Sequence, residues 1–436
     1  MTRGPGEVVV TGVGLALPGA DTPDALLRRT ACAVTGPAAE PFDTAARIGR
    51  RGHRYKDRAT RLALCAALDA LRDARLIPSD GEEVTVPGDT VGVVASSNLG
   101  NLDTACLTAA AIAERSAVDL SPMSLPNASS NVIASWVAIR HGLRGPNLML
   151  CNGATSGLDA VHWGAALVAA GRVRRAVVIG VETHNAVVED LLGRSADELL
   201  DGAAALVVEG ARWAEGRGAR AAATLGRYQR RAGLSGCVEA LLPGGAAPGV
   251  WFTPERYAEG PAGTGAGTGA GAGTDGAVPV PEAVPRYDVT SAVGRASGAL
   301  GVLQCVAAIG WLARAEAGTD AAPGAGPQAA GPQAAGPRAV GSEAAGPRAA
   351  GSEAAERRAA GPQAAGSEAG AGSGTACAAG PGAAPGPVPV PASRQALITS
   401  GDDTADAVAG LLLRPTPDRC HPHPPRAPLI SMECSR

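Results

Sequence analysis

The distribution of apolar and polar positions divides the chain into a regular first half and an irregular second half. From residue 6 to about residue 230, β-branched apolar runs alternate with stretches in which apolar residues recur at helical spacing. The pattern predicts strands at 6–14, 89–96, 147–151, 175–181 and 203–209, and helices at 22–29, 57–75, 127–141 and 155–170. Such an alternation is typical of a layered α/β fold.

The regular pattern is lost after residue 235. A string of Gly, Ala and Thr occupies 258–276, and units such as GPQAA and GSEAA recur between 318 and 391. This composition offers too few large apolar side chains to form a core. Residues 288–314 end in an apolar helix, and residues 394–413 predict two short strands. The organisation that we expect is an N-terminal half (1–235), an incomplete C-terminal half (236–315), a disordered Ala/Gly/Pro-rich insertion (316–392), closing strands (393–414) and a disordered tail (415–436).

Composition and charge narrow the range of partners. The net charge is -3 and only 3% of the residues are aromatic, so we expect neither a cationic surface for nucleic acid nor a base-stacking platform. The sequence has no uninterrupted stretch of 18 apolar residues and no signal-peptide pattern. Nine cysteines without a spacing pattern fit reduced thiols. We therefore expect no membrane association and a cytoplasmic location.

Motifs for cofactors and metals are weak. Lys56 is the only lysine and follows Tyr55 rather than a glycine-rich run, which excludes a Walker A loop. Gly12 and Gly14 could begin a dinucleotide fingerprint, but Leu17 stands where the third glycine is required. Four candidate metal ligands occur in the Pro-rich tail, in an arrangement that fits a disordered end better than a metal site: Cys420, His421, His423 and Cys434. We expect no cofactor and no metal.

The stretch 147–181 is the most informative part of the sequence. A strand, a tight turn at 152–154, a small-residue helix and a second strand form a βαβ unit. This unit places a turn residue at the N-terminus of a helix, where backbone N–H groups stabilise an anion or a thiolate. Cys151 precedes the turn and is expected inside the strand, either as a displaced nucleophile or as a small core residue. Thr155 and Ser156 have no histidine in a plausible motif to activate them.

Five motifs in the right order resemble those of the β-ketoacyl-ACP synthases, a family of the thiolase fold. They are VVVTGVG at 8–14, RYKDRATRLALCAALDAL at 54–71, SPMSLPNASSNVIASWVAIRHGLRGPNLMLCNGATSGLDAV at 121–161, GRVRRAVVIGVET at 171–183 and DGAAALVVEG at 201–210. The resemblance implies a five-layered αβαβα fold, usually dimeric. It also implies condensation of an acyl thioester with malonyl carried on acyl carrier protein (ACP).

The resemblance further implies where catalytic groups should lie, and this chain lacks them. The family's nucleophilic cysteine, at the N-terminus of the helix after a GPN-type strand, corresponds to Ala154. In TSAVGRASGALG at 290–301, Thr290 stands in the position of the family's lysine and Arg295 in that of a histidine. A second histidine is expected between 240 and 285, where the chain has none. Condensation needs a thiolate and imidazoles, so we expect a degenerate site with no catalytic residues.

Three functional hypotheses follow. The favoured one is a non-catalytic subunit of the chain-length-factor type, as in type II polyketide synthases. It would pair with an active ketosynthase in polyketide or fatty-acid biosynthesis and meet the acyl chain and ACP through that partner. The second hypothesis is an active 3-oxoacyl-ACP synthase with a rearranged site, which would use Cys151. The third is a decayed ketosynthase without function.

Overall fold

The computed structural model describes residues 6–31, 40–122, 125–255, 257, 278–316, 393–401 and 405–416. Among these residues, ten strands form one mixed sheet in the order β3-β2-β4-β5-β1-β6-β10-β9-β7-β8. The strands are β1 (Val8–Ala16), β2 (Val91–Ser96), β3 (Asn147–Leu150), β4 (Arg175–Glu182), β5 (Gly202–Gly210), β6 (Ala223–Arg231), β7 (Val250–Phe252), β8 (Arg286–Tyr287), β9 (Ala396–Ser400) and β10 (Val408–Arg414). The helices are α1 (Pro23–Ala31), α2 (Thr44–Ile48), α3 (Arg58–Asp73), α4 (Leu102–Glu114), α5 (Val132–His141), α6 (Ser156–Ala169), α7 (Ala186–Leu192), α8 (Ala211–Gly216), α9 (Leu234–Leu241), α10 (Thr290–Val293) and α11 (Leu300–Glu316).

The sheet consists of two halves with the same strand order. Strands β1 to β5 are arranged as 3-2-4-5-1, and β6 to β10 repeat this order with β6 in the place of β1. In each half the two outermost strands on one side are parallel to the third, and the fourth is antiparallel to its neighbours. The halves join where β1 and β6 form two residue pairs. The C-terminal half was expected to be incomplete; it has all five strands, although β7 and β8 are short.

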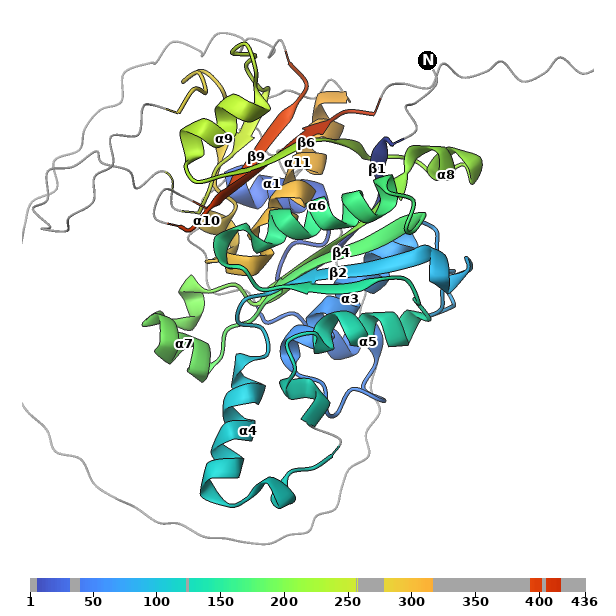
Figure 1. The fold of residues 1–436 in the computed structure, drawn as a ribbon, viewed down its shortest axis with the longest axis vertical. Coiled ribbons are helices and arrows are strands. Elements are labelled where there is room, and N and C mark those ends of the chain that lie inside the picture. Colours follow the sequence, from blue (N-terminus) through green and yellow to red (C-terminus); the bar gives the residue numbers. More distant parts are fainter. Residues whose placement is uncertain are drawn as a thin grey trace, which may run out of the picture. The chain divides into compact units, whose positions relative to one another are not determined.

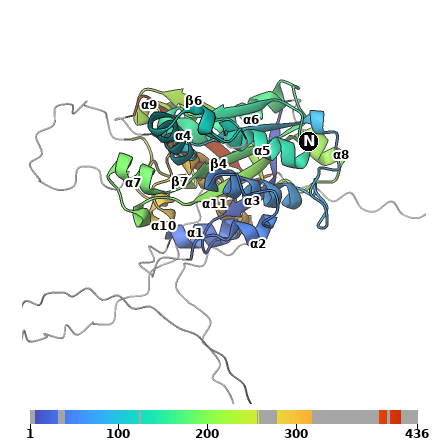
Figure 2. The ribbon, with the colours of Figure 1, turned by 90° about the horizontal axis from the view of Figure 1, so that it is seen from below.

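Five layers result from the packing of helices on this sheet, as the sequence resemblance implied. Helices α3 and α5 cover one face of the first five strands, and α9 packs on the outer face of β6 and β10. Helices α6 and α11 contact each other and lie between the two sheet halves (Figure 1). Figure 2 shows α1 beside α10 and α11, both of which it contacts. The two helices of the middle layer, α6 and α11, both contact strands of each half.

Glycines allow the two central helices to approach closely at their first turns. A Cβ added to Gly157 would lie 2.6 Å from the backbone nitrogen of Gly301, and one added to Gly301 would lie 2.3 Å from that of Leu158. Neither space could hold a side chain. The N-termini of α6 and α11 are thus fixed against each other, next to the region where the sequence places Ala154 and Arg295.

Helix α11 is a core helix. In the part of the chain that the structure describes, Ser297–Glu316 is one helical stretch that is long and apolar enough to cross a membrane, and 78% of its most apolar window is buried. Its apolar character is explained by contacts with both sheet halves and with α1 and α6.

The end of α11 lies beside the start of the closing strands. The Nη2 atom of Arg394 donates to the carbonyl oxygen of Ala315 at 2.6 Å. One residue further on, the carbonyl oxygen of Gln395 accepts from the backbone N–H of Gly249 at 2.8 Å. The predicted low-complexity string, nearly all of the predicted insertion and residues 417–436 of the predicted tail lie outside the described residues.

Most elements of the first half were predicted from the sequence, but one helix begins later than expected. The helix expected at 127–141 starts at Val132, because Leu125–Ala128 forms a 3₁₀ turn. The buried side chain of Asn127 holds this turn: its amide donates to the carbonyl oxygen of Tyr55, and its oxygen accepts from Nε1 of Trp136 at 3.2 Å. These tertiary contacts override the local helical pattern.

Candidate functional site

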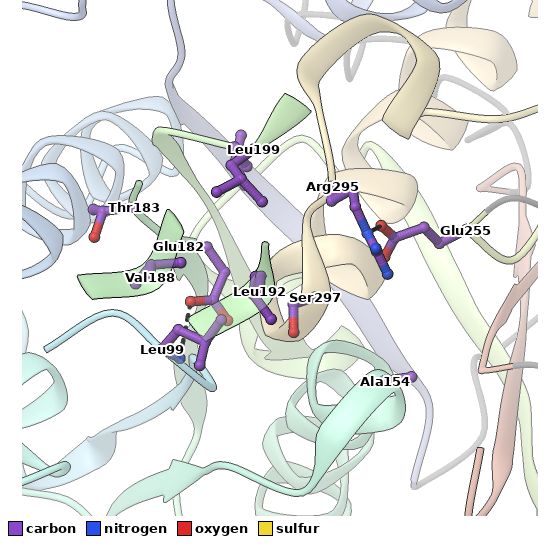
Figure 3. A pocket seen from close by; sticks show the side chains of 11 residues that line it. Leu99, Ala154, Glu182, Thr183, Val188, Leu192, Leu199, Glu255, Arg295 and Ser297 are labelled. Atoms are coloured by element: carbon purple, nitrogen blue, oxygen red, sulfur yellow. Dashed lines mark hydrogen bonds and ion pairs between the residues drawn. The ribbon is translucent and has the colours of Figure 1, made fainter. Parts of the chain in front are cut away.

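The candidate site lies where the carboxyl ends of parallel strands meet. Strand β2 runs parallel to β3 and β4, so the segments that follow these three strands lie at one edge of the sheet. The turn before α11 and the segment after β7 reach the same place. Together they line a partly open cavity of about 170 Å³ (Figure 3), formed by Leu99, Ala154, Glu182, Thr183, Val188, Leu192, Leu199, Leu200, Glu255, Arg295 and Ser297.

Ala154 lies in the turn that opens α6. The chain leaves β3 at Leu150, makes a 3₁₀ turn over Gly153–Thr155 and enters the helix at Ser156. Gly153 has φ = +79°, a value that favours glycine. Ala154 therefore stands at the helix N-terminus, as the sequence predicted, and contributes only a methyl group to the cavity.

The side chain of Asn98 joins the turns before α6 and α11. Its amide nitrogen donates to the carbonyl oxygen of Gly153 at 2.9 Å and to the hydroxyl of Ser297 at 2.8 Å, while its oxygen accepts from the N–H of Gly153 at 3.3 Å. Ser297 has φ = +38°, which is uncommon for a residue other than glycine. Asn98 thus holds the turns before α6 and α11 in fixed relation.

A buried carboxyl group forms the floor of the cavity. Glu182 is the last residue of β4 and is 4% exposed. Its Oε1 accepts from the backbone N–H of Asn98 at 2.6 Å and of Gly298 at 3.0 Å, and its Oε2 accepts from the N–H of Leu99 and the hydroxyl of Ser97, both at 3.1 Å. Burial raises the pKa of Glu182 to about 7, although these four hydrogen bonds favour the charged form.

Arg295 enters the cavity as one half of an ion pair. Its Nε donates to Oε1 of Glu255 at 2.7 Å. Its backbone is held on both sides, because its N–H donates to the carbonyl oxygen of Glu198 at 2.8 Å and its carbonyl oxygen accepts from the N–H of Leu200 at 3.0 Å. The structure therefore brings Arg295 and Ala154 to one cavity.

Glu255 was not recognised in the sequence. It follows β7, within the region 240–285 where the resemblance implied a second histidine. Glu255 reaches the cavity because the fold brings it to Arg295, which lies forty positions later in the sequence. No local sequence pattern indicates a contact over that separation.

Thr290 lies outside the cavity lining. Its N–H and hydroxyl both bond to Oδ1 of Asp288, at 2.8 and 2.6 Å, and this carboxylate stabilises the start of the short helix α10. A hydroxyl group engaged in this way has a local structural role.

The structure corrects the position that was expected for Cys151. Strand β3 ends at Leu150, so Cys151 lies after the strand, and its side chain is exposed rather than part of the core. Partial burial, with a smaller contribution from the charge of Glu182, raises the pKa of its thiol. A thiol whose pKa is raised is a poor nucleophile at neutral pH.

The two hydroxyl residues next to Ala154 are structural. Ser156 is buried; its hydroxyl accepts from the N–H of Asn152 at 2.8 Å and donates to Oδ1 of Asn98 at 2.9 Å. The Thr155 hydroxyl donates to Asp159 at 2.8 Å. No cysteine, histidine or lysine is among the described residues that line the cavity.

Metal ligands are not grouped within the described part of the chain. There, no three His, Cys, Asp or Glu side chains are arranged to hold an ion. The cluster that includes Cys420 and Cys434 lies outside the described residues.

Comparisons with known proteins agree with this geometry. The profile of the family described as Beta-ketoacyl synthase, N-terminal domain, matches residues 29–189. The 3-oxoacyl-(acyl-carrier-protein) synthase 2 of Vibrio harveyi is 29% identical over 142 residues, which cover 32% of this chain and 33% of that protein. The matched segment thus spans about one third of this curated relative.

Solved structures extend the likeness in fold to both halves. The ishigamide ketosynthase/chain length factor has a TM-score of 0.59 at 19% identity, covering 94% of this chain and 99% of that chain. A type II polyketide synthase ACP in complex with its ketosynthase, bound to the hexaketide, has a TM-score of 0.60 at 14% identity, with the same coverage. At these identities the likeness establishes the fold.

Proposed function

Because the chain is β-ketoacyl synthase-like, in sequence over residues 29–189 and in fold across both halves, we propose that it is a non-catalytic ketosynthase subunit of the chain-length-factor type. It would pair with an active ketosynthase in polyketide or fatty-acid biosynthesis. One observation carries the proposal: at the N-terminus of α6, the cavity is lined by the methyl group of Ala154 where the family's chemistry needs a thiol. This supports a subunit that keeps the turn and helix on which a nucleophile would stand, without the nucleophile itself.

The ion pair in the cavity supports the same proposal. Condensation requires neutral donors that stabilise developing negative charge. Arg295 is engaged with the carboxylate of Glu255, and neither group replaces an imidazole that can both donate and release a proton. Loss of a nucleophile alone commonly lowers a rate by about 10⁶, and residues that act as a unit give overlapping losses.

Two features on the surface support pairing with another subunit. Among the described strands, β3 lies at the end of the sheet order and pairs with β2 alone, and its residues are exposed or half-buried. An unpaired strand edge is a template for pairing with another chain. Trp163 on α6 and Ile139 on α5, the helices that contact β3, are 49% and 68% exposed.

Helix α4 is the second feature. None of its residues is buried, although its sequence is mostly apolar, and Leu107 is 69% exposed. In Figure 1 this helix extends away from the sheets. A solvated helix of this composition is better explained by a subunit contact than by an isolated chain. Two of the solved structures with this fold are described as a ketosynthase with a chain length factor and a ketosynthase with its ACP, which is consistent with such partners here.

An active enzyme with a rearranged site is the alternative that one observation favours. Cys151 is exposed and lies three positions before Ala154. If it carried the acyl chain, Cys151→Ala would abolish acyl loading. The raised pKa of this thiol argues against that role.

Reconstitution with malonyl-ACP tests the proposal. The purified chain should give no elongation product alone, and it should form a stoichiometric complex with an active ketosynthase captured from the same cells. Elongation by the chain alone would overturn the proposal, and so would failure to bind any ketosynthase. The Cys151→Ala variant serves as the matched control, because it should behave as the wild type in both assays.

A further inference from the structure

We infer that the cavity beside Ala154 is a binding site for a short-chain monocarboxylate, held at its carboxylate by Arg295. This inference deepens the proposed function and rests on it in one respect: a cavity without a nucleophile can hold such a ligand without converting it. The argument depends on the orientation of Arg295, the apolar wall and the size of the cavity.

Arg295 presents an unused edge of its guanidinium group. Only its Nε is engaged, with Oε1 of Glu255, and its two terminal nitrogens have no partner among the described residues. In Figure 3 the guanidinium group points away from Leu199 and toward the side of the cavity where Ala154 lies. Two parallel N–H groups of this kind match the two oxygens of a carboxylate. Glu255 fixes the plane of the group, which lowers the entropic cost of binding.

Most of the other lining residues are aliphatic. They are Leu99, Val188, Leu192, Leu199 and Leu200, and Ala154 adds a methyl group. Val188 and Leu200 are each 2% exposed, whereas Leu192 is 41% exposed, so these aliphatic side chains extend from the packed interior to the surface. A site of this type favours a ligand with one charged end and a hydrocarbon tail.

The volume limits the length of that tail. An apolar protein cavity of about 150 Å³ holds a benzene molecule. The cavity here has about 170 Å³, so it suits a ligand of about six heavy atoms, such as butyrate.

Two carboxyl groups, Glu182 and Glu255, and one cation, Arg295, are among the described residues that line the cavity. Arg295 is paired with Glu255 through its Nε atom. Both oxygens of Glu182 are engaged by four donors that partly offset its charge. A ligand with two carboxylates would leave its second charge against the aliphatic wall, so the site selects a single carboxylate.

Binding of sodium butyrate to the intact chain tests the inference, with ligand-observed NMR and thermal shift as readouts. We expect saturable one-to-one binding, at least tenfold weaker for butyramide, which has the same shape without the charge. Arg295→Gln should weaken butyrate binding at least tenfold. The control Arg140→Gln, which breaks a partly exposed ion pair with Glu82 on an outer helix, should leave binding unchanged.

Several results would overturn the inference: no saturable binding of butyrate, equal binding of butyramide, or unchanged binding to Arg295→Gln. Tighter binding of the malonyl thioester of N-acetylcysteamine than of butyrate would also overturn it, since the carboxylate would then come from a thioester-bound diacid. If Arg295→Gln fails to fold, the comparison of butyrate with butyramide on the wild type still tests whether the site binds a carboxylate. Elongation of malonyl-ACP by the chain alone would remove the proposed function but leave these binding results intact, so the two failures are distinguishable.

Discussion

Gly298 and Glu182 fit together at the base of the cavity without room for another atom. The N–H of Gly298 donates to Oε1 of Glu182 at 3.0 Å, and a Cβ on Gly298 would lie 2.8 Å from that same oxygen. The buried carboxyl group and the turn before α11 therefore depend on each other. This contact connects the end of a strand in the first half to a central helix of the second.

Gly298→Ala should destabilise the fold. The new Cβ would also lie 2.9 Å from the backbone nitrogen of Asn98, so the turn or the carboxyl group must shift. Overpacking of this kind costs about 1–3 kcal/mol, measured by urea unfolding. Gly236→Ala on α9 is the matched control: a Cβ there meets nothing within 4 Å, and alanine in a helix should stabilise by about 0.5–1 kcal/mol. Equal effects of the two substitutions would contradict the packing argument.

Glu182→Gln should change how stability depends on pH. The folded pKa of about 7 is above the ordinary value of 4.5, so the folded chain keeps a proton that the unfolded chain has released. The wild type therefore loses stability as pH rises from about 4.5 to about 7, by about 3 kcal/mol in total.

The stability of Glu182→Gln minus that of the wild type should consequently rise by about 2.5 kcal/mol between pH 5 and pH 8. Burial lowers the pKa of His53, His141 and His162, and these groups act in the opposite direction, but they are present in both proteins and cancel in the difference. A difference that stays flat with pH would show that Glu182 is charged throughout.

A buried charge network joins β4 and β5 to the end of α8. Glu209 is 0% exposed and bonds to Nη2 of Arg175 at 2.9 Å and of Arg217 at 2.6 Å. Glu209→Gln leaves two guanidinium groups without a compensating charge and should cost about 3–5 kcal/mol of unfolding free energy. Arg28→Gln, which removes an exposed pair with Asp24, should cost less than about 1 kcal/mol. Similar losses for both would mean that water reaches the network.

Leu107→Asp on α4 should separate partner binding from folding. The side chain is 69% exposed, so unfolding free energy should stay within about 0.5 kcal/mol of the wild type. Capture of an active ketosynthase should be lost, because a charge would lie in the apolar contact. Trp213→Gln on α8, where the indole is 49% exposed, controls for the removal of an exposed apolar group elsewhere. Retained capture by Leu107→Asp would exclude α4 from the interface.

Sequence patterns predicted the elements that bury an apolar face. The stretch 147–181 has a strand, a turn and a helix where they were expected, because each element carries its own period. Helix α4 was missed for the opposite reason: none of its residues is buried, so no alternation of apolar and polar positions indicates it. Strands β7 and β8 were missed because three and two residues are too few to form a pattern.

The residues of the candidate site also differ in how far the sequence indicates them. Ala154 and Arg295 could be matched to positions of the family's motifs, because each stands in a motif of fixed spacing. The role of Glu255 could not, since its partner lies on another element and only the fold brings the two together. Glu182 carries no signal in sequence either, because its buried carboxyl group depends on donors from two distant segments, 97–99 and Gly298.

The hydrogen bond between Arg394 and the carbonyl oxygen of Ala315 means that the chain leaves and re-enters the fold at almost the same point. The described ends of the chain on the two sides of residues 317–392, the end of α11 and the start of the strand β9, are thus held close together. This point of the molecule is a natural place to substitute a reporter domain, whose own termini need only be close together.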